Sequence, residues 1–529
     1  MTATTKHRAT IETVVGPTQR ADILRGRITL DQGKTPHVEA EVTIKRPNDT
    51  MYAALDPRTS PQVLISGYAD DEQVRVFLLA VRSREYTDGE LVIRAASFES
   101  ILTDYAPLVD DYTPLSLASS LRTIVTYVLQ KSMPEELWVI GGLWPTPAID
   151  ADMTRYWSVT NLHPNPLPAS VTGYNIASTG TALTYTTLSG EGVIRWTSTA
   201  NVSNLNAGTI NAYRATPGRK YYAAWDWASS AAGRSAALVM EFRTSNGLVL
   251  MSRTTAPFTP YSATFQTLTV EAVAPPGTET VYVYITTTGN TVATQHYVKR
   301  FILTESDYPV SFFYGGSASD ANYAYAWTEG ANASPSTRTA YVERPPAALV
   351  WRAGVSALDF LLPLVQSSGY RLVNNGRWTL RDETYRASGS TTIAAGANIV
   401  TSTDSIDREA RLWFDAQVTR YTWTDVDGMQ YEAVDAYALD PDDYRLVNLE
   451  EKEQPYPGPG YSEYSVRRAQ ERGHEVVATT MTSWDTTAEQ PITITLDDGI
   501  EQQGVIQSVE FDLELDEMTV TVRPDGGTP

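Results

Sequence analysis

The chain has 529 residues, with 41 basic and 62 acidic side chains, a formal net charge of −21 and 42% hydrophobic residues. A chain of this length is too long to fold around a single hydrophobic core, and about three to four domains are expected. The hydrophobic content excludes wholesale disorder. The absence of cysteine excludes disulfides, thiolate metal sites and cysteine nucleophiles. The acid surplus argues against docking onto nucleic acid by phosphate neutralisation.

The first segment, 1–110, alternates apolar and polar residues as strands do. Runs such as ADILRGRITLD and QVRVFLLAVRSREYT are separated by turn formers such as Gly33-Lys34 and Asp88-Gly89. Strands at this spacing with no helix between them predict an antiparallel barrel or sandwich. The N-terminus lacks the apolar core of a signal peptide, and no apolar run approaches the roughly 20 residues of a membrane span. We therefore expect neither Sec export nor membrane insertion.

A helix signal follows the first strands. After Thr113-Pro114, residues 115–131 place six apolar side chains on one face, namely Leu117, Leu121, Ile124, Val125, Val128 and Leu129. We assign 111–150 to the first half of a small α+β connector.

The segment 151–342 has a different texture, rich in Ala, Thr, Ser and Gly, with short strands. It carries 11 basic and 10 acidic side chains, whereas 343–529 carries 15 and 32. Its closing stretch, 312–341, reads FFYGGSASDANYAYAWTEGANASPSTRTAY and resembles the last strands of jelly-roll modules in many phage tail proteins. That group of β-sandwiches overlaps the carbohydrate-binding modules. The resemblance implies a jelly-roll over 151–342.

The start of this segment also resembles the carbohydrate-module family, through the run Asn161 to Pro166. Members often continue with an acidic residue that helps to hold a structural calcium ion. Leu167 and Pro168 stand there instead, so we expect no metal.

Two aromatic pairs in this segment are candidate sugar-binding residues. In TVYVYITTT, Tyr282 and Tyr284 point away from the side that holds the aliphatic residues, and in KYYAAWDWAS, Trp225 and Trp227 share a face. Flat aromatic pairs along a sheet are surfaces on which sugar rings stack. The alternative for the two tryptophans is that they fill the core.

After residue 343 the pattern of the first part resumes. Residues 351–370 contain a helix whose apolar stripe includes Ala357, Phe360 and Leu361, and a hairpin follows at 371–385. We expect 343–388 to complete the connector and the acidic, strand-rich 389–529 to form a second β-barrel. The jelly-roll is then inserted in the connector. Four domains in series is the alternative.

The frame around the insert resembles the minor tail, or tail-tip (baseplate) hub, proteins of long-tailed bacteriophages. The segments that carry the resemblance are 23–45, 74–95, 115–131, WRAGVSALDFL at 351–361, RWTLRD at 377–382 and VIQSVE at 505–510. The resemblance implies a mainly β chain with two tail-tube-like barrels, a homotrimer that closes the tail tube, and a lumen through which DNA passes without specific binding. It also implies location in the virion at the tail tip after assembly in the host cytoplasm. The implied neighbours are distal tail or tail-tube proteins, the tape-measure protein and other tail-tip or receptor-binding proteins, and a host cell-wall glycan is a possible ligand of the jelly-roll.

No catalytic pattern stands out in the sequence. The five histidines form no HExxH pair, no G-x-S-x-G elbow occurs, and carboxylate runs such as 440–443 and 450–453 are typical of solvated loops. We expect a structural, non-enzymatic protein with no catalytic residue, metal or cofactor. The alternatives are a tail-associated glycan hydrolase with a carbohydrate-binding module and a bacterial extracellular glycan-binding adhesin.

Overall fold

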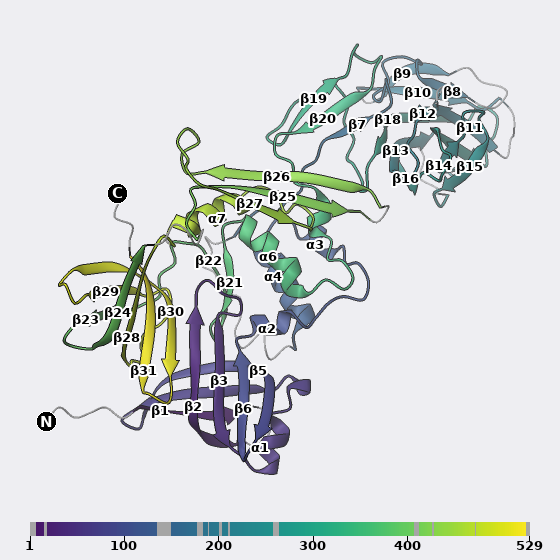
Figure 1. The fold of residues 1–529 in the computed structure, drawn as a ribbon. Helices are drawn as coiled ribbons and strands as arrows, with labels where there is room; N and C mark the ends of the chain where they lie inside the picture. The colour runs from purple at the N-terminus through teal and green to yellow at the C-terminus, as the bar shows by residue number, and fades with distance from the viewer. Residues whose placement is uncertain are drawn as a thin grey trace. The chain divides into compact units, whose positions relative to one another are not determined.

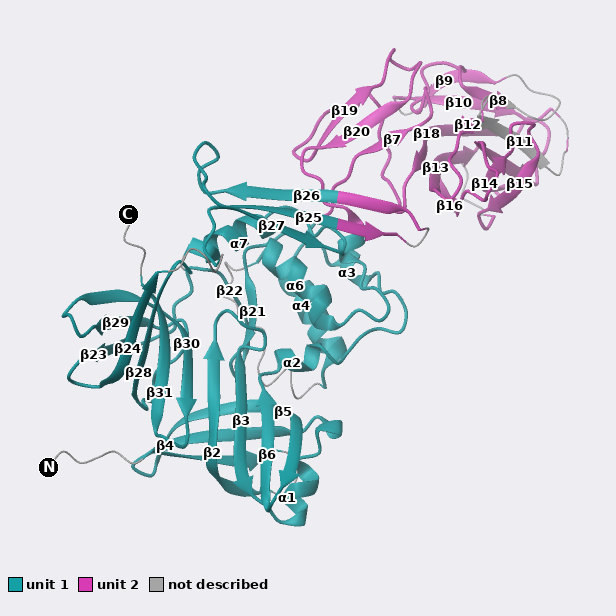
Figure 2. Cartoon of the chain, viewed as in Figure 1, with its two compact units in different colours: residues 1–154, 347–421, 433–529 teal, residues 155–346, 422–432 magenta. Residues whose placement is uncertain are grey.

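The computed structural model describes residues 7–14, 18–134, 150–176, 183–188, 190–199, 201, 204–209, 212–257, 264–406, 412–425, 428–470 and 472–524. The chain forms two compact units (Figure 2), the first from 1–154, 347–421 and 433–529 and the second from 155–346 and 422–432. Strands dominate both units, which confirms the mainly β fold class. The short part 422–432 of the second unit is not part of the predicted jelly-roll. Residues 135–149, assigned to the connector, lie outside the described residues.

The first domain of the first unit is a closed antiparallel barrel (Figure 1). Its strands are β1 (His7–Thr13), β2 (Arg20–Asp31), β3 (Val38–Lys45), β4 (Gln62–Ala69), β5 (Glu72–Thr87) and β6 (Glu90–Ala96). They follow the order β1-β4-β5-β6-β3-β2, and the pairing of β1 with β2 closes the ring. Alternation along each strand places residues such as Ile28, Val42 and Ile93 in the core. The short helices α1 (Asp49–Ala54) and η1 (Pro57–Thr59) join β3 to β4.

The second β domain of this unit, predicted as a second β-barrel over 389–529, has six strands, and no pairing between its two end strands is seen among the described residues. Its strands are β23 (Thr391–Ala394), β24 (Ile399–Ile406), β28 (His474–Met481), β29 (Pro491–Thr495), β30 (Glu501–Asp512) and β31 (Glu517–Pro524). β23 pairs with β29 and β24 pairs with β28, at opposite ends of the sheet. These two end strands follow each other in the chain and are joined by the 394–399 turn, where the Ala394 N–H donates to Asn398 Oδ1 at 2.8 Å.

The two β domains are joined edge to edge. β2 pairs with β30 from Arg27 opposite Asp512 to Asp31 opposite Ser508. Both domains therefore belong to one continuous sheet, and their apolar residues form a single cluster.

The connector contains α2 (Glu99–Leu102), α3 (Thr113–Ser116), α4 (Leu121–Ser132), η2 (Pro346–Leu349), α6 (Ala357–Ser367) and the hairpin β21 (Arg371–Asn374) and β22 (Trp378–Arg381). Its two halves meet where the backbones of Asp111 and Trp351 exchange hydrogen bonds of 2.9 and 3.0 Å. The predicted apolar stripes of α4 and α6 are buried in a common core. However, α4 begins at Leu121 and not near 115, because Ser120 Oγ accepts the Thr123 N–H at 3.2 Å and caps the helix.

A small sheet and one helix complete this part of the chain. β25 (Ala416–Thr424) lies between β26 (Gln430–Ala438) and β27 (Val447–Lys452), and β27 runs parallel to it. Helix α7 (Tyr461–Gln470) follows. Ser462 on α7 is anchored by Asp435 on β26, whose Oδ2 accepts the Ser462 N–H at 2.7 Å.

The second unit is a β-sandwich of two antiparallel sheets. One has the order β16 (Gln266–Val273), β13 (Lys220–Ser229), β18 (Gln295–Glu305), β10 (Glu191–Thr197) and β9 (Thr184–Leu188). The other has the order β15 (Val249–Thr254), β14 (Ser235–Arg243), β17 (Thr280–Thr288), β11 (Asn204–Thr209) and β8 (Tyr174–Ile176), and β12 (Tyr213–Arg214) also pairs with β17. Their facing side chains form one apolar core.

A third, smaller sheet covers part of the outer face of the five-stranded sheet. It contains β7 (Val159–Asn161), β19 (Tyr323–Trp327) and β20 (Ser336–Ala340). Phe313 packs there with Tyr222 and Ile302. The Gly-Gly pair of this stretch has a packing reason, because a Cβ on Gly315 would lie 2.5 Å from the Trp327 ring. None of the helices within the described ranges is long and apolar enough to cross a membrane.

Candidate functional site

Tyr282 and Tyr284 lie on the outer face of the six-stranded sheet. Val281, Val283 and Ile285 of the same strand, β17, are fully buried in the sandwich core. Strand alternation therefore turns the two tyrosines outward, where both are partly exposed. The aliphatic side of TVYVYITTT faces the core, as the sequence predicted.

Two charged residues of the neighbouring strand β14 contact these rings. Glu241 lies opposite Tyr282 in the register, and Arg243 follows two residues later on the same face. The ring centroids of the tyrosines are 5.7 Å apart. The Arg243 guanidinium lies 4.4 Å from the Tyr282 centroid, and the Tyr284 hydroxyl donates to Glu241 Oε1 at 3.0 Å.

The charges of Glu241 and Arg243 compensate each other. Arg243 Nε donates to Glu241 Oε2 at 3.0 Å. Burial, and then the Glu241 carboxylate, raises the pKa of Tyr284 to about 12. The phenol therefore stays protonated at neutral pH and donates its hydrogen bond. Aromatic rings beside a carboxylate and a guanidinium can offer both a stacking surface and partners for hydroxyl groups.

The assignment of Trp225 and Trp227 to a sugar-binding surface is wrong. The two indoles share a face, but that face is the sandwich core, where their exposed fractions are 1% and 0%. Trp225 packs on Phe301 with ring centroids 4.6 Å apart, and Trp227 stacks with His296 at 5.9 Å. The small or polar Ala224, Asp226 and Ala228 alternate with them on the other side of β13.

Sequence reasoning missed Glu241 and Arg243. Their signal was present in SAALVMEFR, where both alternate with the buried Met240 and Phe242. Only the pairing of β14 with β17 brings these charges beside the tyrosines, and pairing between distant strands is not readable from one strand alone.

The Asn161 and Asn165 side chains bind the backbone of their own unit. Asn161 Nδ2 donates to the Phe301 carbonyl at 3.0 Å, and Asn165 Nδ2 donates to the carbonyls of Ser170 and Thr172, each at 3.0 Å. These contacts give the asparagines a structural role. In the part of the chain that the structure describes, no group of three His, Asp or Glu side chains is placed to hold a metal ion.

No protein-family model matches this sequence, and no curated protein matches it. Among solved structures, the chain is similar to the 43 kDa tail protein of prophage MuSo2 from Shewanella oneidensis, with 10% identity, 98% of each chain covered and a TM-score of 0.38. It is also similar to the tail protein from Neisseria meningitidis MC58, with 10% identity, 98% of this chain and 97% of that chain covered, and a TM-score of 0.37.

A partial similarity covers 28% of this chain and 95% of the C-terminal family 22 carbohydrate-binding module of Clostridium thermocellum Xyn10B, with 13% identity and a TM-score of 0.22. The match to the arabinofuranosidase MgGH51, with 14% identity and a TM-score of 0.23, covers 29% of this chain and only 27% of the length of that protein. At these scores the comparisons carry no argument about function.

Proposed function

We propose that this chain is a structural, non-enzymatic component of a bacteriophage tail tip, a trimeric hub that closes the tail tube and leaves a channel for DNA. The proposal rests on the ordered sequence resemblance of the frame to tail-tip hub proteins. The observation that carries it furthest is the β2–β30 ladder, which joins both β domains into one sheet.

This ladder suits a component of a ring. It pairs backbone groups that two separate domains would leave exposed at their edges. Five residue pairs in register also restrict rotation between the domains, so that each chain contributes two β domains at a fixed angle. Three such chains make six β domains, the number that a pseudo-sixfold continuation of a tube requires.

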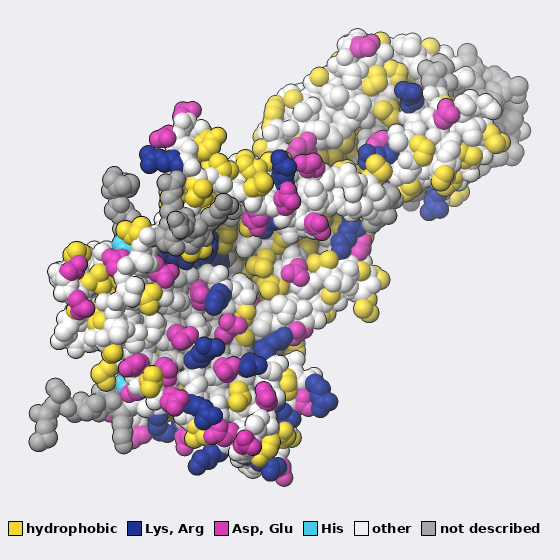
Figure 3. Space-filling model, in the orientation of Figure 1, with side chains coloured by type: hydrophobic (Ala, Val, Ile, Leu, Met, Phe, Trp, Pro, Cys, Tyr) yellow, Lys and Arg dark blue, Asp and Glu magenta, His cyan; other side chains and the backbone are white. Residues whose placement is uncertain are grey.

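The acid surplus of the chain fits a duct for DNA, because carboxylates on a wall repel phosphates. On the face of the molecule that Figure 3 shows, however, acidic and basic side chains are interspersed over the region of the first barrel. Ion pairs such as Arg94–Glu41 at 2.7 Å and Arg82–Asp104 at 2.6 Å neutralise part of this surface. The proposal therefore needs the acidic wall of the duct on a different face of the trimer.

The location is tested in particles. Antibody directed at the second unit should label the tail tip, and the neighbouring proteins recovered by cross-linking should be tail-tube and tape-measure proteins. Label distributed along the tube, or absent from purified particles, contradicts the hub assignment.

For the inserted sandwich, we propose binding of a host cell-surface glycan at Tyr282 and Tyr284, with Glu241 and Arg243 as partners for sugar hydroxyls. The exposed parts of the two rings supply apolar area, and the ion pair supplies fixed polar groups beside it. This surface replaces the one that includes Trp225 and Trp227.

The glycan proposal is tested by titrating the full chain with host cell-wall polysaccharide. Replacing both tyrosines (Tyr282→Ala with Tyr284→Ala) should weaken binding at least about tenfold, since roughly 1.5 kcal/mol of ring burial corresponds to that factor. Tyr185→Ala, on β9 of the other sheet, is the matched control and should leave binding unchanged. Equal losses of binding in both variants, or no binding to wild type at millimolar sugar, contradict this assignment. Release of oligosaccharide from the polysaccharide would favour the hydrolase alternative.

A further inference from the structure

The two β domains of the first unit have the same strand order. In chain order, the barrel strands β1 to β6 correspond to β23, β24, β28, β29, β30 and β31 of the second domain. In both domains the second strand pairs with the third, the third with the sixth, the sixth with the fifth, the fifth with the fourth and the fourth with the first. The pairings agree in direction except that β23 runs parallel to β29, whereas β1 is antiparallel to β4.

The irregularities of these ladders recur at matching positions. The register of β5 with β6 shifts after Val81, and that of β30 with β31 shifts after Ile506. The register of β2 with β3 shifts after Ile23, and that of β24 with β28 shifts after Ile399. In each comparison the shift lies the same number of residues before the last pair of its ladder. Because a β-bulge fixes the local bend and twist of a strand, two matched bulges make the second domain a structural repeat of the first.

The junction between the two repeats uses one strand from each. Arg27 to Asp31, at the end of β2, pair with Ser508 to Asp512, at the end of β30. The second strand of the first repeat is therefore joined to the fifth strand of the second repeat. The counterparts of these two strands are β24, the second strand of the second repeat, and β5, the fifth strand of the first.

Both counterparts have a free edge. β24 pairs with β28 along one edge and with no other strand among the described residues. β5 pairs with β4 only as far as Ala80, and the Val81 N–H then donates to the Pro61 carbonyl at 2.9 Å. Beyond this point, 82–87 pair with β6 on one side and with no described strand on the other. Such edges present unpaired backbone groups to which another strand can bind.

The side chains of the β24 edge also suit a covered position. Because the repeats match residue by residue, Ile406 of β24 corresponds to Leu30 of β2, and Arg84 of β5 corresponds to Val509 of β30. Leu30 and Val509 lie opposite each other in the junction and are fully buried. Ile406, by contrast, is 80% exposed. An added strand would cover this isoleucine with the aliphatic stem of an arginine.

We propose that β24 of one copy of this chain pairs with 82–87 of β5 in a second copy, in the antiparallel register of the β2–β30 junction. Thr403 then lies opposite Thr87, and Ser405 opposite Glu85. The two edges differ, so the contact is head to tail, and copies joined in this way form a ring when the rotation between them closes. The number of copies in the ring, three, rests on the proposed function, whereas the ladder itself does not.

The test uses the absence of cysteine from the chain, because engineered thiols are then the only ones present. Thr403→Cys and Thr87→Cys are introduced together in the full chain, which is oxidised and analysed under denaturing, non-reducing conditions. Directly opposite residues have Cβ atoms about 4.5–5.5 Å apart, close to the spacing of a disulfide. We expect most chains to be linked to another copy.

A mixture of two single variants tests the direction of the contact. Thr403→Cys chains mixed with Thr87→Cys chains should give linked dimers, and neither variant should give them alone. Links between two Thr403→Cys chains would mean that β24 pairs with itself and would overturn the proposal. The register control combines Thr403→Cys with Ser83→Cys, further along the same face of β5, and should give at most about a tenth of the links expected from disulfide geometry at the matched pair.

A charge on the edge should weaken the assembly. Ile406→Lys places an ammonium group in the ladder and should raise the concentration at which copies dissociate at least about tenfold. Leu248→Lys is the matched control, because Leu248 is 66% exposed and lies in the second unit. It should leave the assembly unchanged, and equal effects of the two variants would contradict the ladder.

The outcomes separate the ladder from the trimeric hub. Matched cysteines that link into closed rings of another size would support the ladder and contradict the trimer. A trimer whose matched cysteines do not link, and which Ile406→Lys does not dissociate, would keep the trimer and overturn the ladder. A chain that stays monomeric and unlinked at roughly 100 μM, where even a weak specific interface would assemble, overturns both.

Discussion

The two aromatic pairs of the sandwich have opposite environments. Trp225 and Trp227 are buried, whereas Tyr282 and Tyr284 are partly exposed, although both pairs have the same spacing along a strand. The tyrosines could be placed from the sequence because aliphatic residues alternate with them. The tryptophans alternate with Ala and Asp and share their strand face with the buried Tyr221, so the face that carries the large side chains turns to the core.

Substitution should lower the unfolding free energy much more at the buried tryptophans than at the partly exposed tyrosines. Trp227→Ala leaves a large void in a close-packed core and is expected to cost about 3–5 kcal/mol of unfolding free energy. Tyr282→Ala, which empties a surface position, should cost less than about 1 kcal/mol. Denaturant unfolding followed by fluorescence measures both, and equal costs would contradict the assignment of the two faces.

Glu99 is a buried carboxyl group of the connector. Its Oε1 accepts the Asn374 N–H at 2.6 Å, but Oε2 has no hydrogen-bond partner, and neither does the buried Asn374 Oδ1. Burial is the main cause that raises the pKa of Glu99 to about 7. A proton on Oε2 would turn this unpartnered buried acceptor into a donor.

The stability of the protein should therefore depend on pH through Glu99. Between its ordinary pKa and about 7, the unfolded chain releases the proton while the folded chain keeps it, so that stability falls as pH rises through this window, by up to about 3 kcal/mol. Glu99→Gln should remove this fall. Unfolding free energies measured from pH 5 to pH 8 test it, and a variant curve parallel to that of wild type would contradict it.

The buried histidines change stability with pH in the opposite direction to Glu99, and they are present in both wild type and the Glu99→Gln variant. Burial lowers the pKa of His163 to about 3 and those of His37 and His296 to about 4. Their contribution is present above pH 6.5 and is lost as pH falls towards these values. Comparison of wild type with Glu99→Gln cancels this common part.

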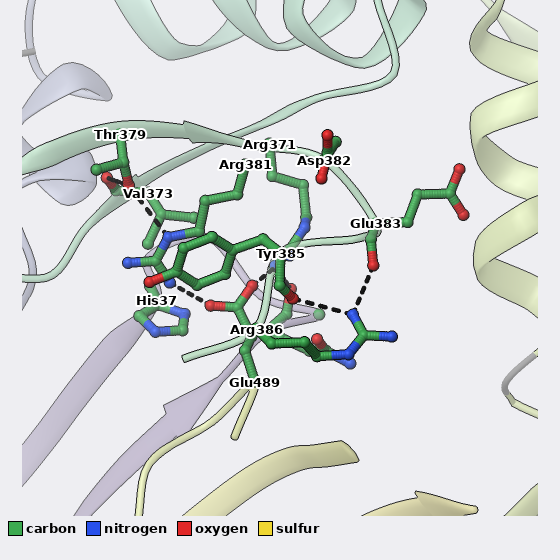
Figure 4. A network of polar contacts seen from close by, with 12 residues as sticks. His37, Arg371, Val373, Thr379, Arg381, Asp382, Glu383, Tyr385, Arg386 and Glu489 are labelled. Atoms are coloured by element: carbon green, nitrogen blue, oxygen red, sulfur yellow. Dashed lines mark hydrogen bonds and ion pairs between the residues drawn. The ribbon is translucent and has the colours of Figure 1, made fainter. Parts of the chain in front are cut away.

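At the scale of elements, one carboxylate connects several parts of the first unit. Glu489, in the loop before β29, pairs with Arg371 of β21 and Arg381 of β22 and is fully buried (Figure 4). The guanidinium of Arg371 also reaches the turn after β2 through Gln32. This network ties the connector hairpin to both β domains.

Glu489→Gln should leave two buried guanidiniums without their counter-charge. We expect a loss of about 3–5 kcal/mol in the unfolding free energy of the first unit. The matched control is Glu463→Gln, which breaks an exposed pair with Arg467 of 2.7 Å and should cost at most about 0.5 kcal/mol. A Glu489→Gln loss as small as that of the control would show that the network does not hold these elements together.

The elements that could be predicted are those whose signal is local. The stripe of α6 and the β21–β22 hairpin follow from periodicity and from the Asn-Gly turn between Asn374 and Arg377. The parallel pairings of β25 with β27 and of β23 with β29 could not be predicted, because each depends on which distant strand supplies the hydrogen bonds.

At the scale of the whole chain, the ends of the second unit lie close together. The Arg344 N–H donates to the Tyr156 carbonyl at 2.6 Å, and the Ser158 N–H donates to Glu343 at 3.1 Å. Closely spaced ends are the condition under which an insertion leaves its host fold intact. The sequence indicated this nesting through the contrast in charge and through the resumed helix and hairpin pattern.

Deletion of 157–343 with a short Gly/Ser linker should therefore leave the first unit folded. Circular dichroism and a single cooperative unfolding transition with an unchanged Glu489→Gln effect are expected. Loss of cooperative unfolding in the deleted chain would mean that the second unit is required for the first one to fold.

The measurement that tests the central claim most directly is the native mass of the purified full chain in solution. A trimeric hub predicts about 175 kDa, three times the 58.2 kDa of one chain. The chain that lacks the second unit should also be a trimer, with three times its own, smaller mass. A monomer of about 58 kDa at concentrations up to roughly 100 μM, where even a weak specific interface would assemble, would contradict the account.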